Sequence, residues 1–129
     1  MKTSPSIDKW LEEAKRDENA AKCGMYLVHN GVVRETARKA VRENAEGTLP
    51  VTAMEFSYDE NLVRRAEENA LALPGIFYVR TWLNEGLLRP GDDIMYVLVG
   101  GDIRPHVVDA LQSLVGELKN NCVSEKELY

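Results

Sequence analysis

Residues 94–118, IMYVLVGGDIRPHVVDALQSLVGEL, decide the fold. The first six are apolar throughout, which is typical of a strand buried on both faces. Gly-Gly-Asp at 100–102 interrupts the run, and Pro105 favours the first turn of a helix. Apolar residues then recur at helical spacing, at Val107, Val108, Leu111, Leu114, Val115 and Leu118. The segment therefore predicts a central strand followed by an amphipathic helix.

The preceding sequence predicts further strands and helices in one domain over residues 1–129. Strands are expected over residues 23–33, 51–58 and 76–83, where β-branched and aromatic residues gather. Helices are expected after Ser-Pro-Ser at 4–6 and after Asp59, both of which are capping signals. The resulting order, α, β, β, α, β, β, α, does not alternate strictly. It therefore favours an α+β sandwich over a doubly wound parallel sheet.

Both ends of the chain are expected to lie outside this core. Residues 1–6 form a short N-terminal extension before the first helical face. Residues 120–129 are mostly polar and contain no apolar stripe. A polar terminus of this kind is expected to be mobile unless a partner orders it.

The composition excludes several classes of protein. Apolar residues make up 44% of the chain, and 16 basic against 21 acidic residues give a net charge of −5, which argues against a general nucleic-acid binder. No apolar run reaches the roughly 20 residues that a membrane span needs. Cys23 and Cys122 lack metal-type spacing, and only two histidines are present. We therefore expect a cytoplasmic protein with reduced thiols, no metal site and no cofactor.

Two regions are candidates for binding an anion. Residues 100–105 join the predicted strand to a helix N-terminus, where backbone N–H groups and Arg104 attract negative charge. A plain turn with a solvated arginine fits the same residues. The second region is a basic run, Arg34, Arg38, Lys39 and Arg42. It fits either a solvated loop or a clamp on an anionic ligand.

Three residues near the C-terminus carry candidate catalytic groups. A lysine such as Lys119, at the end of a helix, is expected from the helix dipole alone. If it were partly desolvated, its pKa would fall, and Lys119 or Lys126 would then suit proton transfer or nucleophilic attack. Cys122 is a reactive thiol only if Lys119 stabilises its thiolate. A passive, buried cysteine is the simpler interpretation.

Together these segments resemble the catalytic (large) subunit of molybdopterin synthase, the MoaE-like family. The resemblance spans residues 7–127. It is carried by Gly-Val-Val-Arg at 31–34, the strand at 51–58, the Leu-Arg-Pro-Gly-Asp turn at 88–92 with its following strand, Arg104, and the lysines at 119 and 126. The resemblance implies an α/β hammerhead-type fold and a homodimer. It also implies a heterotetramer with a small ubiquitin-like sulfur carrier at each end.

The resemblance further implies the reaction and the residues that perform it. The carrier's C-terminal Gly-Gly thiocarboxylate would enter a pocket and pass its sulfur to cyclic pyranopterin monophosphate, forming the dithiolene of molybdopterin. Lys119 and Lys126 would be the catalytic residues. Arg34 and Arg104 would bind the phosphorylated pterin, with Arg104 serving the neighbouring subunit's site. Arg38, from the basic run, is a further candidate for substrate binding that matches no family motif.

Some family positions differ here and leave two other functions open. Ile103 stands where the family has His before its Arg, residues 83–88 lack an Arg, and residues 123–126 lack a Pro and a Trp. A catalytically impaired homologue that binds a ubiquitin-like carrier fits these changes. A sensor of small anions or nucleotides, using Arg104 and the basic run, is the third hypothesis.

Overall fold

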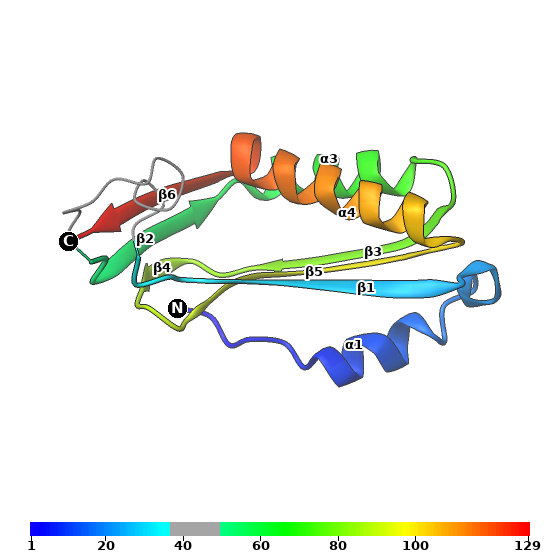
Figure 1. Cartoon of the computed structure of the whole chain (residues 1–129), viewed down its shortest axis with the longest axis horizontal. Helices are drawn as coiled ribbons and strands as arrows, with labels where there is room; N and C mark the ends of the chain where they lie inside the picture. The colour runs from blue at the N-terminus through cyan, green and yellow to red at the C-terminus, as the bar shows by residue number, and fades with distance from the viewer. Residues whose placement is uncertain (37–49) are drawn as a thin grey trace.

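The fold is built on sheet A, a three-stranded antiparallel sheet in the order β1-β5-β3 (Figure 1). The computed structural model describes residues 1–36 and 50–129. In sheet A, β1 is Met25–Val32, β3 is Ile76–Leu83 and β5 is Asp93–Gly101. The predicted central strand is confirmed, because β5 pairs on both edges and its residues 97–99 have no exposed surface.

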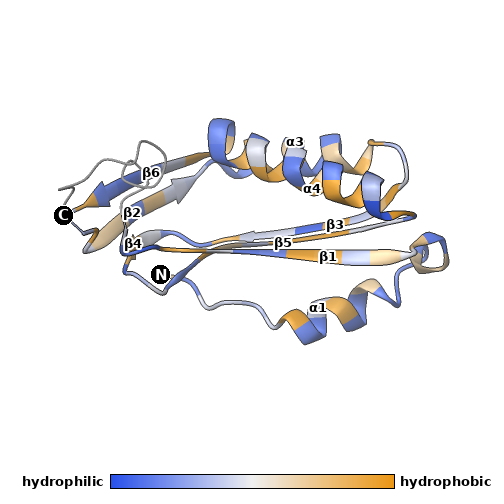
Figure 2. Ribbon diagram, in the orientation of Figure 1, coloured by the Kyte–Doolittle hydropathy of each residue, from blue (hydrophilic) through white to orange (hydrophobic). Residues whose placement is uncertain are grey.

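Helices cover both faces of sheet A. Helices α3 (Glu60–Leu71) and α4 (Arg104–Glu117) lie on one face, and α1 (Ile7–Ala14) lies on the other (Figure 1). Alternation along β5 sends Val97 and Val99 into the core beneath α3 and α4 and sends Leu98 toward α1. Figure 2 shows the mixture of apolar and polar residues along the helices that this arrangement requires. The predicted amphipathic helix is thus confirmed.

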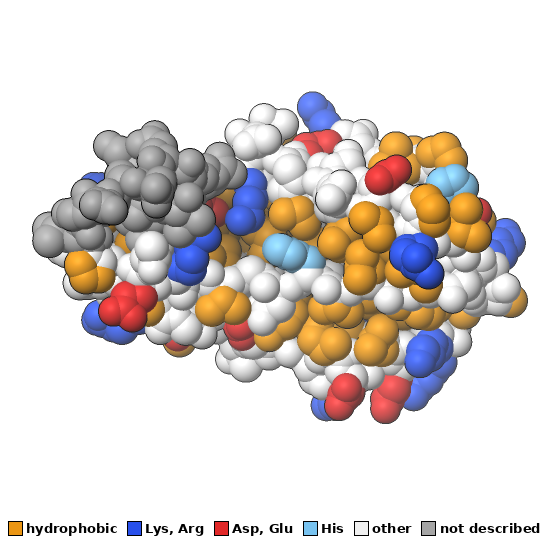
Figure 3. All heavy atoms as spheres, in the orientation of Figure 1, with side chains coloured by type: hydrophobic (Ala, Val, Ile, Leu, Met, Phe, Trp, Pro, Cys, Tyr) orange, Lys and Arg blue, Asp and Glu red, His pale blue; other side chains and the backbone are white. Residues whose placement is uncertain are grey.

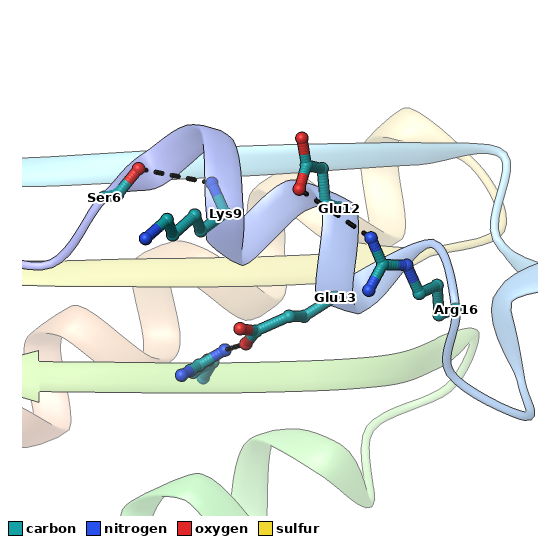
Figure 4. Close-up of polar contacts among 6 residues, drawn as sticks. Ser6, Lys9, Glu12, Glu13 and Arg16 are labelled. Atoms are coloured by element: carbon teal, nitrogen blue, oxygen red, sulfur yellow. Dashed lines mark hydrogen bonds and ion pairs between the residues drawn. The ribbon is translucent and has the colours of Figure 1, made fainter.

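The two capping predictions are also confirmed. Ser6 accepts a hydrogen bond from the backbone N–H of Lys9 at 3.3 Å, and Asp59 accepts from those of Asn61 and Leu62. A short helix, η1 (Ala20–Lys22), follows α1. An ion pair between Glu13 and Arg80 of β3 then holds α1 to the sheet (Figure 4). This ion pair adds to the packing of Trp10 and Ala14 of α1 against Leu98 of β5.

A second antiparallel sheet, sheet B, has the order β4-β2-β6 and extends beyond the helices (Figure 1). It consists of β4 (Gly86–Leu88), β2 (Ala53–Tyr58) and β6 (Val123–Leu128). The prediction of a mobile tail over residues 120–129 is wrong, because β6 pairs with β2 along its whole length. The π-helical turn η2 (Leu118–Cys122) carries the chain from α4 into β6. Alternating residues of the tail face the inner and outer sides of this sheet, so its polar character does not prevent pairing.

The two sheets are joined by a buried amide and the N-terminal extension. Asn84 is 1% exposed, accepts from the backbone N–H groups of Lys2 and Glu85, and donates to the carbonyl of Asp93. The ammonium group of Lys2 also lies 2.8 Å from the hydroxyl of Tyr58 in β2. The observed architecture is the predicted α+β sandwich.

Candidate functional site

Lys119 is held on the surface by the turn that contains it. Its neighbours in η2, Leu118 and Cys122, are buried and anchor the turn in the core. The side chain of Lys119 is exposed in the single chain, so it is not the desolvated amine that the catalytic interpretation requires. Burial lowers the pKa of His29 of β1, and the positive charge of Lys119 lowers it further.

Lys126 lies in a pocket on the outer face of sheet B. In the ladder it is opposite Glu55, on the side away from the buried residues Met54 and Phe56. The pocket has a volume of about 380 Å³ and is lined by Glu55, Phe56, Ser57, Gly86, Leu87, Ser124 and Lys126. It therefore combines an ammonium, a carboxylate, hydroxyl groups and a half-exposed leucine.

Arg34 lies at the same end of the molecule as Lys126. It follows β1, and the next carbonyl, that of Glu35, accepts from the N–H of Val51 at 2.7 Å. The N–H of Thr52 in turn donates to the carbonyl of Leu128, two residues beyond Lys126. These bonds bring the backbone at Arg34 close to the end of β6. The guanidinium is exposed and donates to the carbonyl of Thr36.

Arg104 lies at the opposite end of α4 from Lys119. Fifteen residues separate them, which corresponds to roughly 22 Å along a helix. One chain therefore cannot bring both residues to a single small ligand. Arg38, like Lys39 and Arg42, lies outside the described residues.

Figure 3 shows how this face of the molecule is organised. Basic side chains lie toward both ends of this face, and apolar side chains occupy much of the area between them. Lys119, Lys126 and Arg34 all belong to elements at or leading into sheet B, where α4 ends. Three of the five predicted residues thus lie in one half of the molecule.

His29 is the feature that the sequence prediction missed. Its Nε2 atom is buried and has no hydrogen-bond partner among residues 1–36 and 50–129. Burial lowers the pKa of this imidazole, and the positive charge of Lys119 lowers it further. The available signal was period-two alternation, which places His29 on the same side of the strand as Met25 and Leu27.

Cys122 behaves as a structural cysteine. It is 4% exposed. Burial raises the pKa of its thiol, and the negative charges of Glu117 and Asp59 raise it further. These shifts favour the thiol over the reactive thiolate at neutral pH.

Within residues 1–36 and 50–129, His, Cys, Asp and Glu side chains form no group of three or more able to hold a metal ion. None of the helices there has the length and apolar character needed to cross a bilayer.

Comparison with known proteins relates this arrangement to one family. The model of the family described as MoaE protein matches residues 3–121. No curated protein matches the chain. Solved structures with the same fold include molybdopterin synthase from Staphylococcus aureus, with a TM-score of 0.73 and 17% identity, covering 98% of this chain and 87% of that one.

Two further solved structures show the same likeness. Molybdopterin cofactor biosynthesis protein E from Burkholderia multivorans has a TM-score of 0.73 and 19% identity, covering 98% of this chain and 79% of that one. The complex of subunits 1 and 2 of molybdopterin-converting factor from Helicobacter pylori has a TM-score of 0.66 and 16% identity. That match covers 95% of this chain and 75% of the other. At these identities the likeness is one of fold.

Proposed function

This chain belongs to the MoaE protein family, and on that premise we propose that it is the large subunit of molybdopterin synthase. A thiocarboxylated ubiquitin-like carrier donates sulfur to cyclic pyranopterin monophosphate. In each transfer sulfur bonds to a pterin carbon and a carbon–oxygen bond at that carbon breaks, the oxygen leaving with the opened cyclic phosphate or as water. The carrier's acyl–sulfur bond breaks by reaction with water, and the acyl group leaves as a carboxylate. Two such transfers produce the dithiolene of molybdopterin.

The placement of the lysines carries this proposal. Lys126 lines a pocket of about 380 Å³, and Lys119 lies in the turn that leads into the same strand. An extended Gly-Gly tail is thin enough to enter such a pocket, and the ammonium groups offset the negative charge of the thiocarboxylate. A lysine so placed also moves protons between the attacking and leaving groups. Coverage by the carrier supplies the desolvation that Lys119 lacks in the single chain.

The phosphorylated substrate needs further positive charge, which the arginines supply. Arg34 lies near the end of β6 and offers a planar pair of donors to a phosphate. Arg38 is assigned to the same role only as a member of the basic run at 34–42, without a motif match. Arg104 is too far from Lys119 in its own chain, so we assign it to the site of a second copy. The protein then acts as a homodimer, with one carrier on each subunit, in the cytoplasm.

Reconstitution tests the reaction directly. The purified chain, its thiocarboxylated carrier and cyclic pyranopterin monophosphate should yield molybdopterin. Lys119→Ala should lower the rate by about 10²- to 10⁴-fold, the range expected for loss of a positioned proton-transfer group. Lys15→Ala, at an exposed lysine just after α1, is the matched control and should leave the rate unchanged. Full activity in the Lys119 variant would remove this residue from the mechanism.

Subunit exchange tests the role of Arg104. Arg104→Ala and Lys119→Ala chains, each inactive alone, should regain part of the activity when mixed. In a mixed dimer one site receives both intact residues. Light scattering should meanwhile show a dimer. A monomer at working concentration, or no recovery on mixing, would contradict the shared site.

A carrier-binding module without turnover is the second candidate. Ile103 favours it, because this residue is 53% exposed and its side chain does not cap α4. It also stands at the position where the family has a histidine. Calorimetry that detects carrier binding in a chain unable to form molybdopterin would select this function.

A further inference from the structure

His29 is a partly exposed residue whose Nε2 atom is buried and takes no part in holding the fold. Met25 and Leu27 of β1 pack into the core beneath α4, whereas Tyr26 and Val28 pack toward α1. His29 is next on the helix-facing side. Its buried Nε2 atom has no partner in the described parts of the chain. Such an atom destabilises the fold, so a role in binding explains its presence better than a role in packing.

Two neighbours give this imidazole the surroundings of a binding site. Lys119, in the turn after α4, is close enough for its charge to act on the ring. Gly31 lies two residues along β1 on the same side, and a Cβ atom there would stand 3.6 Å from Nε2. The same Cβ would stand 3.2 Å from Cγ of Met95, so glycine at position 31 keeps a methyl group from crowding the imidazole.

Building on the proposed function, we propose that His29 and Lys119 together bind the anionic end of the carrier tail. On binding, the partly exposed ring turns so that its Nε2–H group donates a hydrogen bond to the terminal thiocarboxylate, and the ammonium of Lys119 supplies the opposing charge. His29 is thus a substrate-binding residue that orients the acyl–sulfur group. No covalent bond to the imidazole is formed, and its proton stays on the ring.

The electrostatics of the site agree with this role. Burial, followed by the charge of Lys119, holds the pKa of His29 below the ordinary histidine value. The ring is therefore neutral at pH 7 and has one N–H group to donate. Lys119 is the charged group that acts on the ring. On β5, the residues opposite His29 and Gly31 are Val97 and Met95, and both are apolar. A bound anion would reverse the balance of charge and raise the pKa.

Nuclear magnetic resonance of the ring nitrogens tests binding without requiring turnover. The chain is titrated with a synthetic peptide ending in a Gly-Gly carboxylate, and separately with the same peptide as its amide. The acid should raise the pKa of His29 by about one unit, whereas the amide should not. His106, at the far end of α4, serves as the internal reference. An equal His29 pKa with both peptides at millimolar concentration would overturn the proposal.

Kinetics of variants separate binding from folding. His29→Leu should raise the KM for the thiocarboxylated carrier about 10-fold or more, the loss expected for a hydrogen bond to a charged group. His29→Gln keeps an N–H donor and should fall between this variant and the native chain. Because leucine removes an unpaired buried polar atom, the melting temperature of His29→Leu should not fall. A merely structural histidine would give the reverse pattern, with a lower melting temperature and an unchanged KM.

Gly31→Ala provides an independent variant next to the imidazole. Its methyl group would stand 3.6 Å from Nε2 and 3.2 Å from Cγ of Met95, a flexible side chain, and would hinder movement of the ring. It should raise the same KM while leaving His29 in place. If the native chain forms no molybdopterin, the synthase proposal fails, and the peptide titration still decides the role of His29. If the native chain turns over and His29→Leu has an unchanged KM, only the His29 assignment fails.

Discussion

Sheet A and sheet B differ in how completely they are buried, and the difference separates the parts of the chain that hold the fold from those available for chemistry. Helices cover sheet A on both faces, and the middle of β5 is inaccessible to solvent. Sheet B has shorter strands, and its outer face carries the pocket with Lys126. Charged groups are costly in the first environment and free to meet a ligand in the second. The proposed catalytic lysines accordingly lie in or beside sheet B.

Matched leucine truncations in the two sheets test this contrast with the largest expected effect. Leu98 of sheet A has no exposed surface, whereas Leu87 of sheet B is 50% exposed. Leu98→Ala should lower the free energy of unfolding by about 2–5 kcal/mol through lost burial and a residual cavity. Leu87→Ala should change it by less than about 1 kcal/mol. Urea unfolding of both variants gives the comparison, and equal losses would break it.

The same contrast explains how much of the molecule could be predicted from the sequence. Sheet A was predictable because residues 94–99 form a continuous apolar run and the capping residues mark the helices. Strand β4 was missed because three residues, one of them Gly86 with φ of +99°, show no periodicity. Strand β6 was taken for a mobile tail because Ser124, Glu125 and Lys126 lack strand-like side chains. Its order comes from backbone pairing with β2, which composition does not report.

The candidate site divides along similar lines. Family resemblance assigned roles to Lys119 and Lys126, and local pattern alone did not separate either from an ordinary surface lysine. No sequence signal could reveal the pocket around Lys126, because it is formed by three separate segments, residues 55–57, 86–87 and 124–126. His29 was detectable in principle as a polar residue in phase with apolar ones. Recognising it as an unpaired group required its neighbours in space.

Asn84 tests the connection between the two sheets. It bonds the N-terminal extension, the start of β4 and the start of β5 with one buried amide. Asn84→Ala leaves those backbone groups without their partner and should lower the free energy of unfolding by about 1–3 kcal/mol. Hydrogen exchange should become faster at the backbone amides of Lys2 and Glu85, because both donate hydrogen bonds to the side chain of Asn84. Protection that is unchanged at both amides would mean that the sheets are joined by other contacts.

Asp59 tests the start of α3, the helix that follows sheet B and covers sheet A. Its carboxylate accepts from two backbone N–H groups at 2.9 and 3.2 Å. Asp59→Ala should lower the free energy of unfolding by about 1 kcal/mol, whereas Asp59→Asn, which keeps an oxygen acceptor, should lower it less. Thermal unfolding of the two Asp59 variants shows whether alanine is more destabilising than asparagine. Asp109→Ala, at an exposed position inside α4, is the control and should have a smaller effect.

The smallest predicted effect is a pH dependence at Asp93, where the N-terminal extension meets sheet A. Burial opposes ionisation of this carboxyl group, but hydrogen bonds from Ser4, Asn30 and Tyr96 outweigh it and hold its pKa below the ordinary value. Because the folded-state pKa is the lower one, the stabilisation is complete above the unfolded-state pKa. It is lost as the pH falls from there through the folded-state value.

Urea unfolding between pH 7 and pH 3 measures this contribution. The stability difference between the native chain and Asp93→Asn should be largest at pH 7 and should shrink as the pH falls below about 4, the ordinary range for Asp. Ser4→Ala removes one of the three donors and should give a smaller difference with the same pH dependence. A difference that stays constant across the range would show that the neutral side chain makes the same contacts. The carboxylate charge would then contribute nothing to attaching the N-terminal extension to sheet A.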